Sequence, residues 1–228
     1  MNLFSELATL IFQKRCLLCS TVNHELDSNL GICVVCLGAS NNKRSIVNRG
    51  LLRIFVGSEF NSTNSHIILA AKEDNNKFAR RVLAEYLNSA LELATCERTV
   101  FLIPIPSRKA ADRIRGFAHV SRLIQELAKL NPDRKFELIN CLRHTKKIRD
   151  QSTLNINERE LNMRGAFEID IEEYNRLSGG NISKFPLFLV DDLVTTGSTV
   201  LAANSALISL GIAVKGVLAS CATNGFTH

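Results

Sequence analysis

The sequence predicts an α/β protein in which a mostly parallel sheet is flanked by helices, with a small cysteine-rich module near the N-terminus. Three observations predict this. Short apolar segments alternate with segments of helical periodicity, as in the βαβ units that build parallel sheets. One apolar segment runs directly into two acidic residues and a bend rich in hydroxyl groups, which is typical of the carboxyl edge of such a sheet. Four cysteines form two close pairs near the start of the chain.

Each element is predicted from its own pattern. Helices are expected over 75–94 and 117–130, and from Thr199 to Leu210, where Gly211 closes the last of them. Strands are expected where short apolar segments are rich in β-forming residues, over 99–105, 136–142, 185–190 and 213–219. Residues 1–12 fit a short amphipathic helix, and 65–72 fit either a strand or a helix. The polar segment 144–162 is expected to be a long loop, and loops of that length are usually functional.

The composition excludes several classes of protein. With 228 residues, of which 46% are hydrophobic and 22% charged, the chain is unlike a disordered or collagen-like sequence. No apolar run approaches the roughly 18 residues of a membrane helix, and the first residues lack the basic segment of a secretory signal. We therefore expect a cytoplasmic protein with no membrane span. Its expected parts are 1–45, with a helix and the cysteine module, and 46–228, the α/β domain. The pattern leaves the oligomeric state open.

The two cysteine pairs predict a structural zinc site. Cys16 and Cys19 form one Cys-x2-Cys pair, Cys33 and Cys36 form the other, and thirteen residues separate the pairs. The total of seven cysteines is odd, which together with the missing secretory signal favours a metal over disulfides. Two such pairs can supply four thiolates to one tetrahedral Zn²⁺. The alternative is an accidental clustering of buried cysteines.

Positive charge is concentrated in one segment. Residues 108–149 contain twelve Lys or Arg and four Asp or Glu, a net charge of +8, whereas the whole chain carries +6. Such a segment suggests an anionic partner, such as a polyphosphate or the backbone of a nucleic acid. A solvated basic face is the alternative. Because only 6% of residues are aromatic, a stacking platform for single strands is not evident.

The segment from Val190 to Thr199 carries most of the functional signal. The apolar strand ends in Asp191 and Asp192, and a bend with four hydroxyl residues and Gly197 leads into a helix. The free N–H groups at a helix N-terminus favour a phosphate, and adjacent carboxylates can accept hydrogen bonds from a diol or hold a cation. Helix capping is the alternative, but one Ser or Thr is enough for a cap.

This segment resembles the binding motif for 5-phosphoribosyl 1-pyrophosphate (PRPP) of type I phosphoribosyltransferases. From about Cys16 to Ala222, the chain resembles the ComF/GntX family of competence-associated, phosphoribosyltransferase-like proteins. Three further stretches carry the resemblance: Ile103–Arg108 continuing to Arg115-Gly116-Phe117; Arg143 through Gln151 to Arg159, then Asn162-x2-Gly165-Ala166-Phe167; and the cysteine pairs.

The resemblance implies a type I phosphoribosyltransferase-like fold and a set of site residues. Asp191 and Asp192 would face the ribose hydroxyls, and Val194, Thr195, Thr196, Gly197, Ser198 and Thr199 would hold the 5′-phosphate. Ser107, Arg108 and Lys109 would bind pyrophosphate, with Arg108 joining the two acids in catalysis. A flexible lid would carry Arg143, Lys147, Arg149, Gln151 and Arg159. Mg²⁺ would accompany PRPP.

The resulting hypothesis is Mg²⁺-dependent transfer of 5-phosphoribosyl to an unidentified acceptor. The resemblance connects it with natural transformation and the handling of imported DNA. The alternative is a non-catalytic adaptor that binds single-stranded DNA and a DNA-processing partner such as a helicase. This chemistry needs no covalent protein nucleophile, and His119 and His144 are interpreted as surface or capping residues rather than catalysts.

Overall fold

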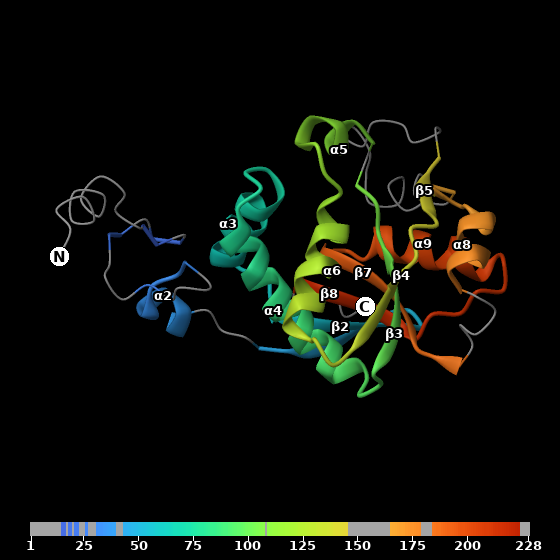
Figure 1. The fold of residues 1–228 in the computed structure, drawn as a ribbon, viewed down its shortest axis with the longest axis horizontal. Coiled ribbons are helices and arrows are strands. Elements are labelled where there is room, and N and C mark those ends of the chain that lie inside the picture. The colour runs from blue at the N-terminus through green and yellow to red at the C-terminus, as the bar shows by residue number, and fades with distance from the viewer. Residues whose placement is uncertain are drawn as a thin grey trace.

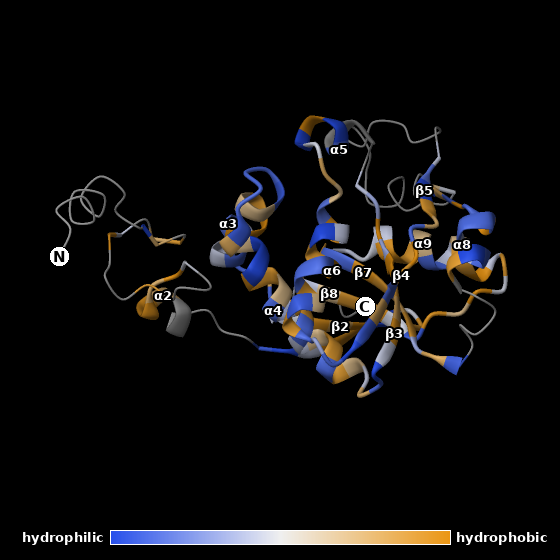
Figure 2. Ribbon diagram, in the orientation of Figure 1, coloured by the Kyte–Doolittle hydropathy of each residue, from blue (hydrophilic) through white to orange (hydrophobic). Residues whose placement is uncertain are grey.

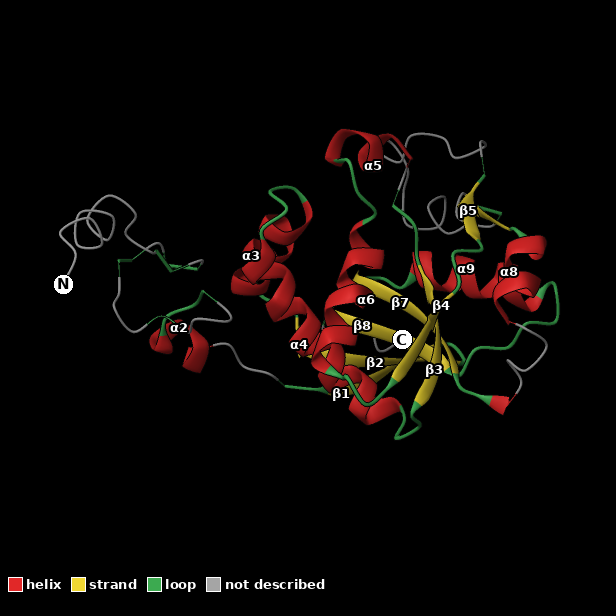
Figure 3. Ribbon diagram, viewed as in Figure 1, coloured by secondary structure: helices red, strands yellow, loops and turns green. Residues whose placement is uncertain are grey.

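The computed structural model describes residues 15–16, 18–19, 21–22, 26, 31–39, 43–107, 109–145, 165–178 and 184–223 (Figure 1). A six-stranded sheet with strand order β1-β2-β8-β7-β3-β4 forms its centre (Figure 3). The strands are β1 (Ser45–Arg49), β2 (Leu52–Glu59), β3 (Thr99–Pro104), β4 (Lys135–Leu138), β7 (Leu187–Val194) and β8 (Gly216–Ala222). β1 is antiparallel to β2, and all other neighbours are parallel. The predicted α/β class with a mostly parallel sheet is confirmed.

Helices cover both faces of this sheet. One face packs against α3 (Ser62–Lys72), α4 (Lys77–Ala94) and α6 (His119–Leu130). The other face packs against α9 (Ser198–Ile208), α8 (Ile171–Ser178) and a two-stranded antiparallel sheet of β5 (Leu142–His144) and β6 (Phe167–Ile169). Two shorter helices, α2 (Val34–Ala39) and α5 (Lys109–Arg115), lie outside these layers. Figure 2 shows how hydropathy follows this layering: hydrophobic residues predominate in the central strands, and many hydrophilic residues lie on the helices around them.

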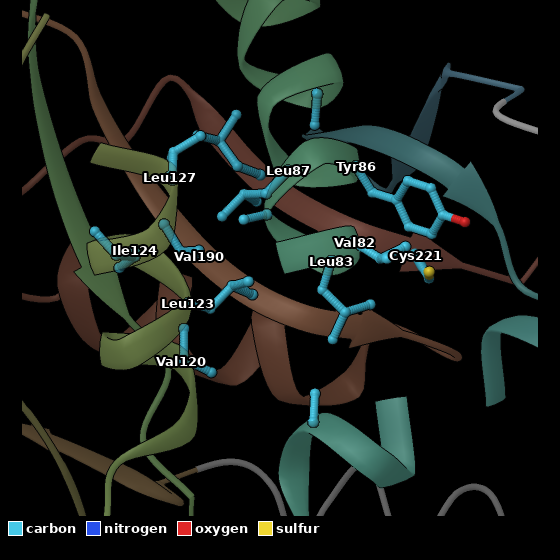
Figure 4. Close-up of a cluster of buried hydrophobic side chains, with 14 of the residues drawn as sticks. Val82, Leu83, Tyr86, Leu87, Val120, Leu123, Ile124, Leu127, Val190 and Cys221 are labelled. Carbon is cyan, nitrogen blue, oxygen red and sulfur yellow. The ribbon is translucent and has the colours of Figure 1, made fainter. Parts of the chain in front are cut away.

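The core follows from the alternation of side chains along the strands. In β7, Phe188 and Val190 pack against α4 and α6, whereas Leu187 and Leu189 pack on the α9 side. Figure 4 shows Leu87 and Leu127 meeting between α4 and α6, over the strand that carries Val190. A strand apolar on both faces must be central in a parallel sheet, which is where β7 lies.

The helix α4 illustrates why the sequence predicted the helices well. Its N-cap Asn76 accepts hydrogen bonds from the backbone N–H groups of Phe78 and Ala79, which the helix itself leaves unpaired. Its buried residues recur at helical spacing: Ala79, Val82, Leu83, Ala84, Tyr86, Leu87, Ala90 and Leu91. Burying one leucine side chain of this kind stabilises the fold by about 2 kcal/mol.

Several elements differ from the prediction. The hairpin of β1 and β2 was not predicted, because polar residues and Gly57 interrupt its short apolar pattern. The ambiguous segment 65–72 belongs to a helix, α3. The expected strand over 136–142 is divided between β4 and β5, which belong to different sheets. β7 continues through Asp191 and Asp192 to Val194, so the acids lie within the strand rather than after it.

Among the helices of the described part of the chain, none has both the length and the apolar character that a membrane span needs.

Gly57 provides a test of how closely β2 packs against α4. A Cβ atom at this position would overlap the backbone carbonyl of Tyr86, and backbone atoms cannot move aside as a flexible side chain can. Gly57→Ala is therefore expected to lower the free energy of unfolding by about 3 kcal/mol, as in severe overpacking. Urea unfolding measures this. The control Leu51→Ala changes a fully exposed side chain of the same hairpin and should cost less than about 0.5 kcal/mol. Equal stability of the two variants would contradict the close approach.

Candidate functional site

The two acidic residues Asp191 and Asp192 lie near the carboxyl end of β7. The pairing of this strand with β3 ends at Val190, whereas its pairing with β8 continues to Val194, so among the described strands β8 alone pairs with the part that carries the acids. The carboxylate of Asp191 accepts a hydrogen bond from the Asp192 backbone N–H at 2.9 Å, and that of Asp192 accepts one from Leu193 at 2.9 Å. Both side chains are thereby oriented by local backbone donors.

Asp192 lies between two basic side chains from different helices. Its Oδ2 atom is 3.5 Å from Lys72 Nζ, at the end of α3, and 3.4 Å from His119 Nε2, at the start of α6. The side chain of Asp192 is 7% exposed and that of His119 only 1%. Neither ring nitrogen of His119 makes a regular hydrogen bond within the described residues. The interpretation of His119 as a surface residue or cap was therefore wrong, and Ala118 is the N-cap of α6.

These surroundings shift the pKa values of the two carboxyl groups in opposite directions. Burial, followed by the charge of neighbouring Asp192, raises the pKa of Asp191 well above its ordinary value. Burial acts in the same direction on Asp192, but the imidazole of His119 and the charge of Lys72 outweigh it and lower the pKa of Asp192. Asp192 is thus the member of the pair that stays ionised to the lower pH.

The bend after β7 presents several unused backbone donors. Thr195 and Thr196 are exposed, and Gly197, the N-cap of α9, has a φ of 85°, a left-handed conformation that favours glycine. No side chain caps α9, and the first bond of the helix runs from Leu201 to the Gly197 carbonyl at 2.9 Å. Within the described residues, the N–H groups of Thr196, Gly197, Thr199 and Val200 have no hydrogen-bond acceptor.

A concave run of free N–H groups at a helix N-terminus is a suitable site for a phosphate. The hydroxyl groups of Thr196 and Ser198 lie 2.9 Å apart at its mouth and can add donors. The bend joins the end of β7, which carries the acids, to the start of α9, so the residues predicted for the phosphate and for the ribose are consecutive along the chain.

The other predicted residues are less completely placed. Ser107 is half-buried in the loop after β3. Lys109 begins α5, but its side chain lies outside the described residues, as do Arg108, Lys147, Arg149, Gln151 and Arg159. Arg143, in β5, donates to the carbonyls of Asn140 and Leu142 and lies 3.5 Å from Asp170. Arg143 therefore connects β5 to the segment that carries Asp170.

Two cavities border this region. One, of about 270 Å³, lies at the carboxyl end of β3, and its lining includes Pro106, Ser107, His119, Asn140 and Arg143. The larger, of about 720 Å³, lies between α9 and β6. His119 thus lines the smaller cavity and also lies close to the carboxylate of Asp192.

The basic segment 108–149 does not form one unpaired patch where the structure describes it. Arg115 lies 3.2 Å from Glu73 and 3.0 Å from Asp112, and its side chain is almost fully buried. Other cations of this segment also lie close to acids: Lys129 to Glu126, Lys135 to Glu137, and Arg143 to Asp170. Of the seven cations in this segment whose side chains are described, four lie close to an acid.

The four predicted zinc ligands lie together. The sulfur atoms of Cys16, Cys19, Cys33 and Cys36 are all within 4.8 Å of one another, and those of Cys19 and Cys33 are 3.8 Å apart. Tetrahedral zinc with Zn–S bonds of about 2.3 Å places its sulfur ligands about 3.8 Å apart. The donor set and its geometry therefore fit Zn²⁺.

The surroundings of these sulfur atoms also suit a metal. The backbone N–H groups of Leu18 and Cys33 donate to the sulfur of Cys16 at 3.4 and 3.3 Å. Hydrogen bonds from Thr21 lower the pKa of Cys19 to about 6, whereas burial and then the neighbouring thiols raise the pKa of Cys36 to about 12. A divalent cation among the sulfur atoms would favour the thiolate form of all four.

The cluster is not isolated from the α/β domain. Cys16, Ile32 and Cys33 belong to the same apolar cluster as α3 and α4. A Cβ atom on Gly31 would lie 2.8 Å from the ring of Phe78, which shows how closely the two segments approach. Contacts therefore cross the boundary expected near residue 45.

Three residues near the site were missed by sequence reasoning: Arg49, Lys72 and His119. Each comes from a segment distant along the chain, and none lies in a motif that indicates its contact. No pattern in the sequence could have identified them without knowledge of the strand order.

No protein-family model matches this chain, and no curated protein matches it either.

The cysteine cluster predicts metal content. Purified protein is expected to hold one Zn²⁺ per chain by elemental analysis, because four thiolates close a tetrahedral site. Cys33→Ser removes a buried ligand and should reduce zinc content strongly. Cys96→Ser is the matched control, since Cys96 is exposed and outside the cluster. Metal-free wild-type protein, or equal zinc in both variants, would contradict a structural zinc site.

The contacts of Asp192 predict a pH-dependent contribution to stability. Asp192→Asn should lower the free energy of unfolding at pH 7 by about 2 kcal/mol, the usual size for hydrogen bonds to a charged group. Since the folded-state pKa of Asp192 is depressed, its contribution is present above its unfolded pKa, about 4, and is lost as the pH falls further.

Urea unfolding of wild type and variant across a pH series measures this difference, which should shrink below about pH 4. Asp133→Asn, in an exposed turn, is the control and should cost less than about 0.5 kcal/mol. A difference that stays constant into acid would show that charge at Asp192 is not its cause.

Proposed function

We propose that this protein binds PRPP and transfers its 5-phosphoribosyl group to an acceptor, as a type I phosphoribosyltransferase-like protein of the ComF/GntX kind. The observation that supports this most is the continuity of the site. β7 carries Asp191 and Asp192 directly into a bend in which the N–H groups of Thr196 and Gly197 have no acceptor among the described residues. Gly197, in a left-handed conformation, is the N-cap of the helix that follows. A sugar phosphate needs hydrogen-bond donors for its phosphate and, beside them, carboxylates that accept hydrogen bonds from its sugar hydroxyls.

The proposed binding mode assigns a part of the ligand to each feature. The 5′-phosphate would accept hydrogen bonds from the N–H groups of the bend and from the hydroxyls of Thr195, Thr196, Ser198 and Thr199. The ribose 2′ and 3′ hydroxyls would donate to the carboxylates of β7. Asp192 is the stronger acceptor of the pair, because Lys72 and His119 keep it ionised.

The chemistry requires stabilisation of charge rather than a protein nucleophile. As the bond between C1 and pyrophosphate breaks, positive charge develops at C1 and negative charge on the leaving group. Ser107, Arg108 and Lys109 follow β3, the strand beside β7, so they would be donors to the departing pyrophosphate. Mg²⁺ bound with PRPP would neutralise part of the pyrophosphate charge. Closure of the loop after Arg143 would exclude water, so that the acceptor takes the sugar.

The zinc cluster has a structural role in this proposal, because all four tetrahedral positions are filled by thiolates and none is left for substrate. Participation in natural transformation and DNA uptake rests on the family resemblance. Among the described residues, no separate observation favours the non-catalytic adaptor, and four of the seven described cations of segment 108–149 lie close to an acid. It is an outcome of the test below.

The first test is ligand binding. PRPP with Mg²⁺ is expected to raise the melting temperature of the wild-type protein. The double variant Asp191→Asn, Asp192→Asn should lose that increase, because neutral amides are weaker acceptors for the ribose hydroxyls. Glu92→Gln, an exposed acid on α4, is the control and should respond as the wild type does.

The second test is turnover, measured as pyrophosphate release with bases, amines and single-stranded DNA offered as acceptors. Release that depends on an acceptor and on Asp192 supports the enzyme. If PRPP binds but no pyrophosphate is released with any of the acceptors offered, the result favours an adaptor in which the pocket is regulatory. An unchanged melting temperature at millimolar PRPP would count against PRPP as the ligand in either form.

A further inference from the structure

Arg49 is a buried cation in contact with the bend, although it belongs to a distant part of the chain. It is the last residue of β1 and is 9% exposed. One guanidinium nitrogen, NH2, donates to the carbonyl oxygen of Thr195 at 3.2 Å, and NH1 donates to that of Asn48 at 3.2 Å. A Cβ atom on Gly197 would lie only 2.8 Å from Cγ of Arg49. The side chain therefore packs directly against the bend, in space that a residue larger than glycine would occupy.

The charge of this guanidinium has no counter-ion where the structure describes the chain. Its partners are neutral carbonyl groups, its Nε atom is buried without a hydrogen-bond partner, and no carboxylate lies within ion-pairing distance. A buried charge without an opposite charge is costly, and such groups normally pair with an ion. This arrangement indicates an anion beside the bend when the site is filled.

The contact with Thr195 also determines where the backbone donors point. The Thr195 carbonyl receives hydrogen bonds from Arg49 and from the hydroxyl of Thr223, at 3.2 and 3.3 Å. In a trans peptide the carbonyl and the following N–H point in opposite directions, and the described chain has no cis peptide. Holding this carbonyl therefore fixes the orientation of the Thr195–Thr196 peptide and with it the direction of the Thr196 N–H.

We propose that Arg49 is a positioning residue of the phosphate site, which orients the Thr195–Thr196 peptide and supplies the positive charge for a phosphomonoester dianion. This inference rests on the proposed function for the identity of the site. It adds that Arg49, which lies outside the bend after β7, makes the site favour a ligand whose phosphate is doubly charged.

The test compares Arg49→Met, Arg49→Lys and the control Arg53→Met by calorimetric titration with inorganic phosphate and ribose 5-phosphate. Arg53 is exposed on the adjacent strand, so its replacement removes the same net charge without touching the bend. Arg49→Met should weaken ribose 5-phosphate binding roughly tenfold or more, the usual effect of losing a charge-assisted contact. Arg49→Lys, which keeps a cationic donor, should restore much of the affinity, and Arg53→Met should bind as the wild type does.

Melting temperatures without ligand separate this role from a purely structural one. Because Arg49→Met removes an uncompensated buried charge, its unliganded melting temperature should equal or exceed that of the wild type while its affinity falls. A lower melting temperature with unchanged affinity would overturn the proposal, and so would a wild-type protein that binds neither phosphate probe.

A parallel titration with PRPP and Mg²⁺ distinguishes the two proposals. If ribose 5-phosphate binds in an Arg49-dependent way but PRPP does not bind, the proposed function fails and the role of Arg49 stands. If PRPP binds the wild type and Arg49→Met equally well, the role of Arg49 fails and the proposed function stands.

Discussion

The central position of β7 is the constraint on which the candidate site depends. Its first half is paired with both β3 and β8, and its end, from Asp191 to Val194, stays paired with β8. The end of the strand is thereby attached to the centre of the sheet, and Gly197 provides the left-handed turn into α9. Binding and transfer of a charged ligand benefit from donors that are in place beforehand, since little reorganisation is then needed. The fold places the candidate site at the end of a strand that stays paired with β8 as far as Val194.

Polar groups without partners gather around this strand end. Most buried polar atoms in proteins are hydrogen-bonded, and exceptions often mark sites of function. Within the described residues, the exceptions include the ring nitrogens of His119 and Nε of Arg49, both in contact with residues 191–197. The free N–H groups of the bend add to them. Polar groups without partners lower the free energy of unfolding of the unliganded protein. An anionic ligand that pairs with them would bind with a correspondingly more favourable free energy.

The cysteine cluster contributes differently, through packing rather than chemistry. Cys16 and Cys33 are buried against the layer that contains α3 and α4, and α3 ends at Lys72, which contacts Asp192. A metal that orders the cluster would therefore support the helix layer behind the site. In this arrangement a bound metal would stabilise the surroundings of the acids without touching a ligand.

The amino-acid sequence by itself determined the repeating pattern of strands and helices, the cysteine spacing and the acid-to-hydroxyl segment after Val190, because each is encoded by neighbours along the chain. Helix α4 and strand β3 were predictable for this reason, and so was the convergence of the four sulfur atoms. Only the tertiary structure placed β1 and β2 in the sheet, since these short, interrupted segments become strands when β2 pairs with β8 and β1 pairs with β2. It alone also brought Arg49, Lys72 and His119 to the strand end. Contacts between residues as far apart as 49 and 195 depend on strand order and helix packing, which local patterns do not encode.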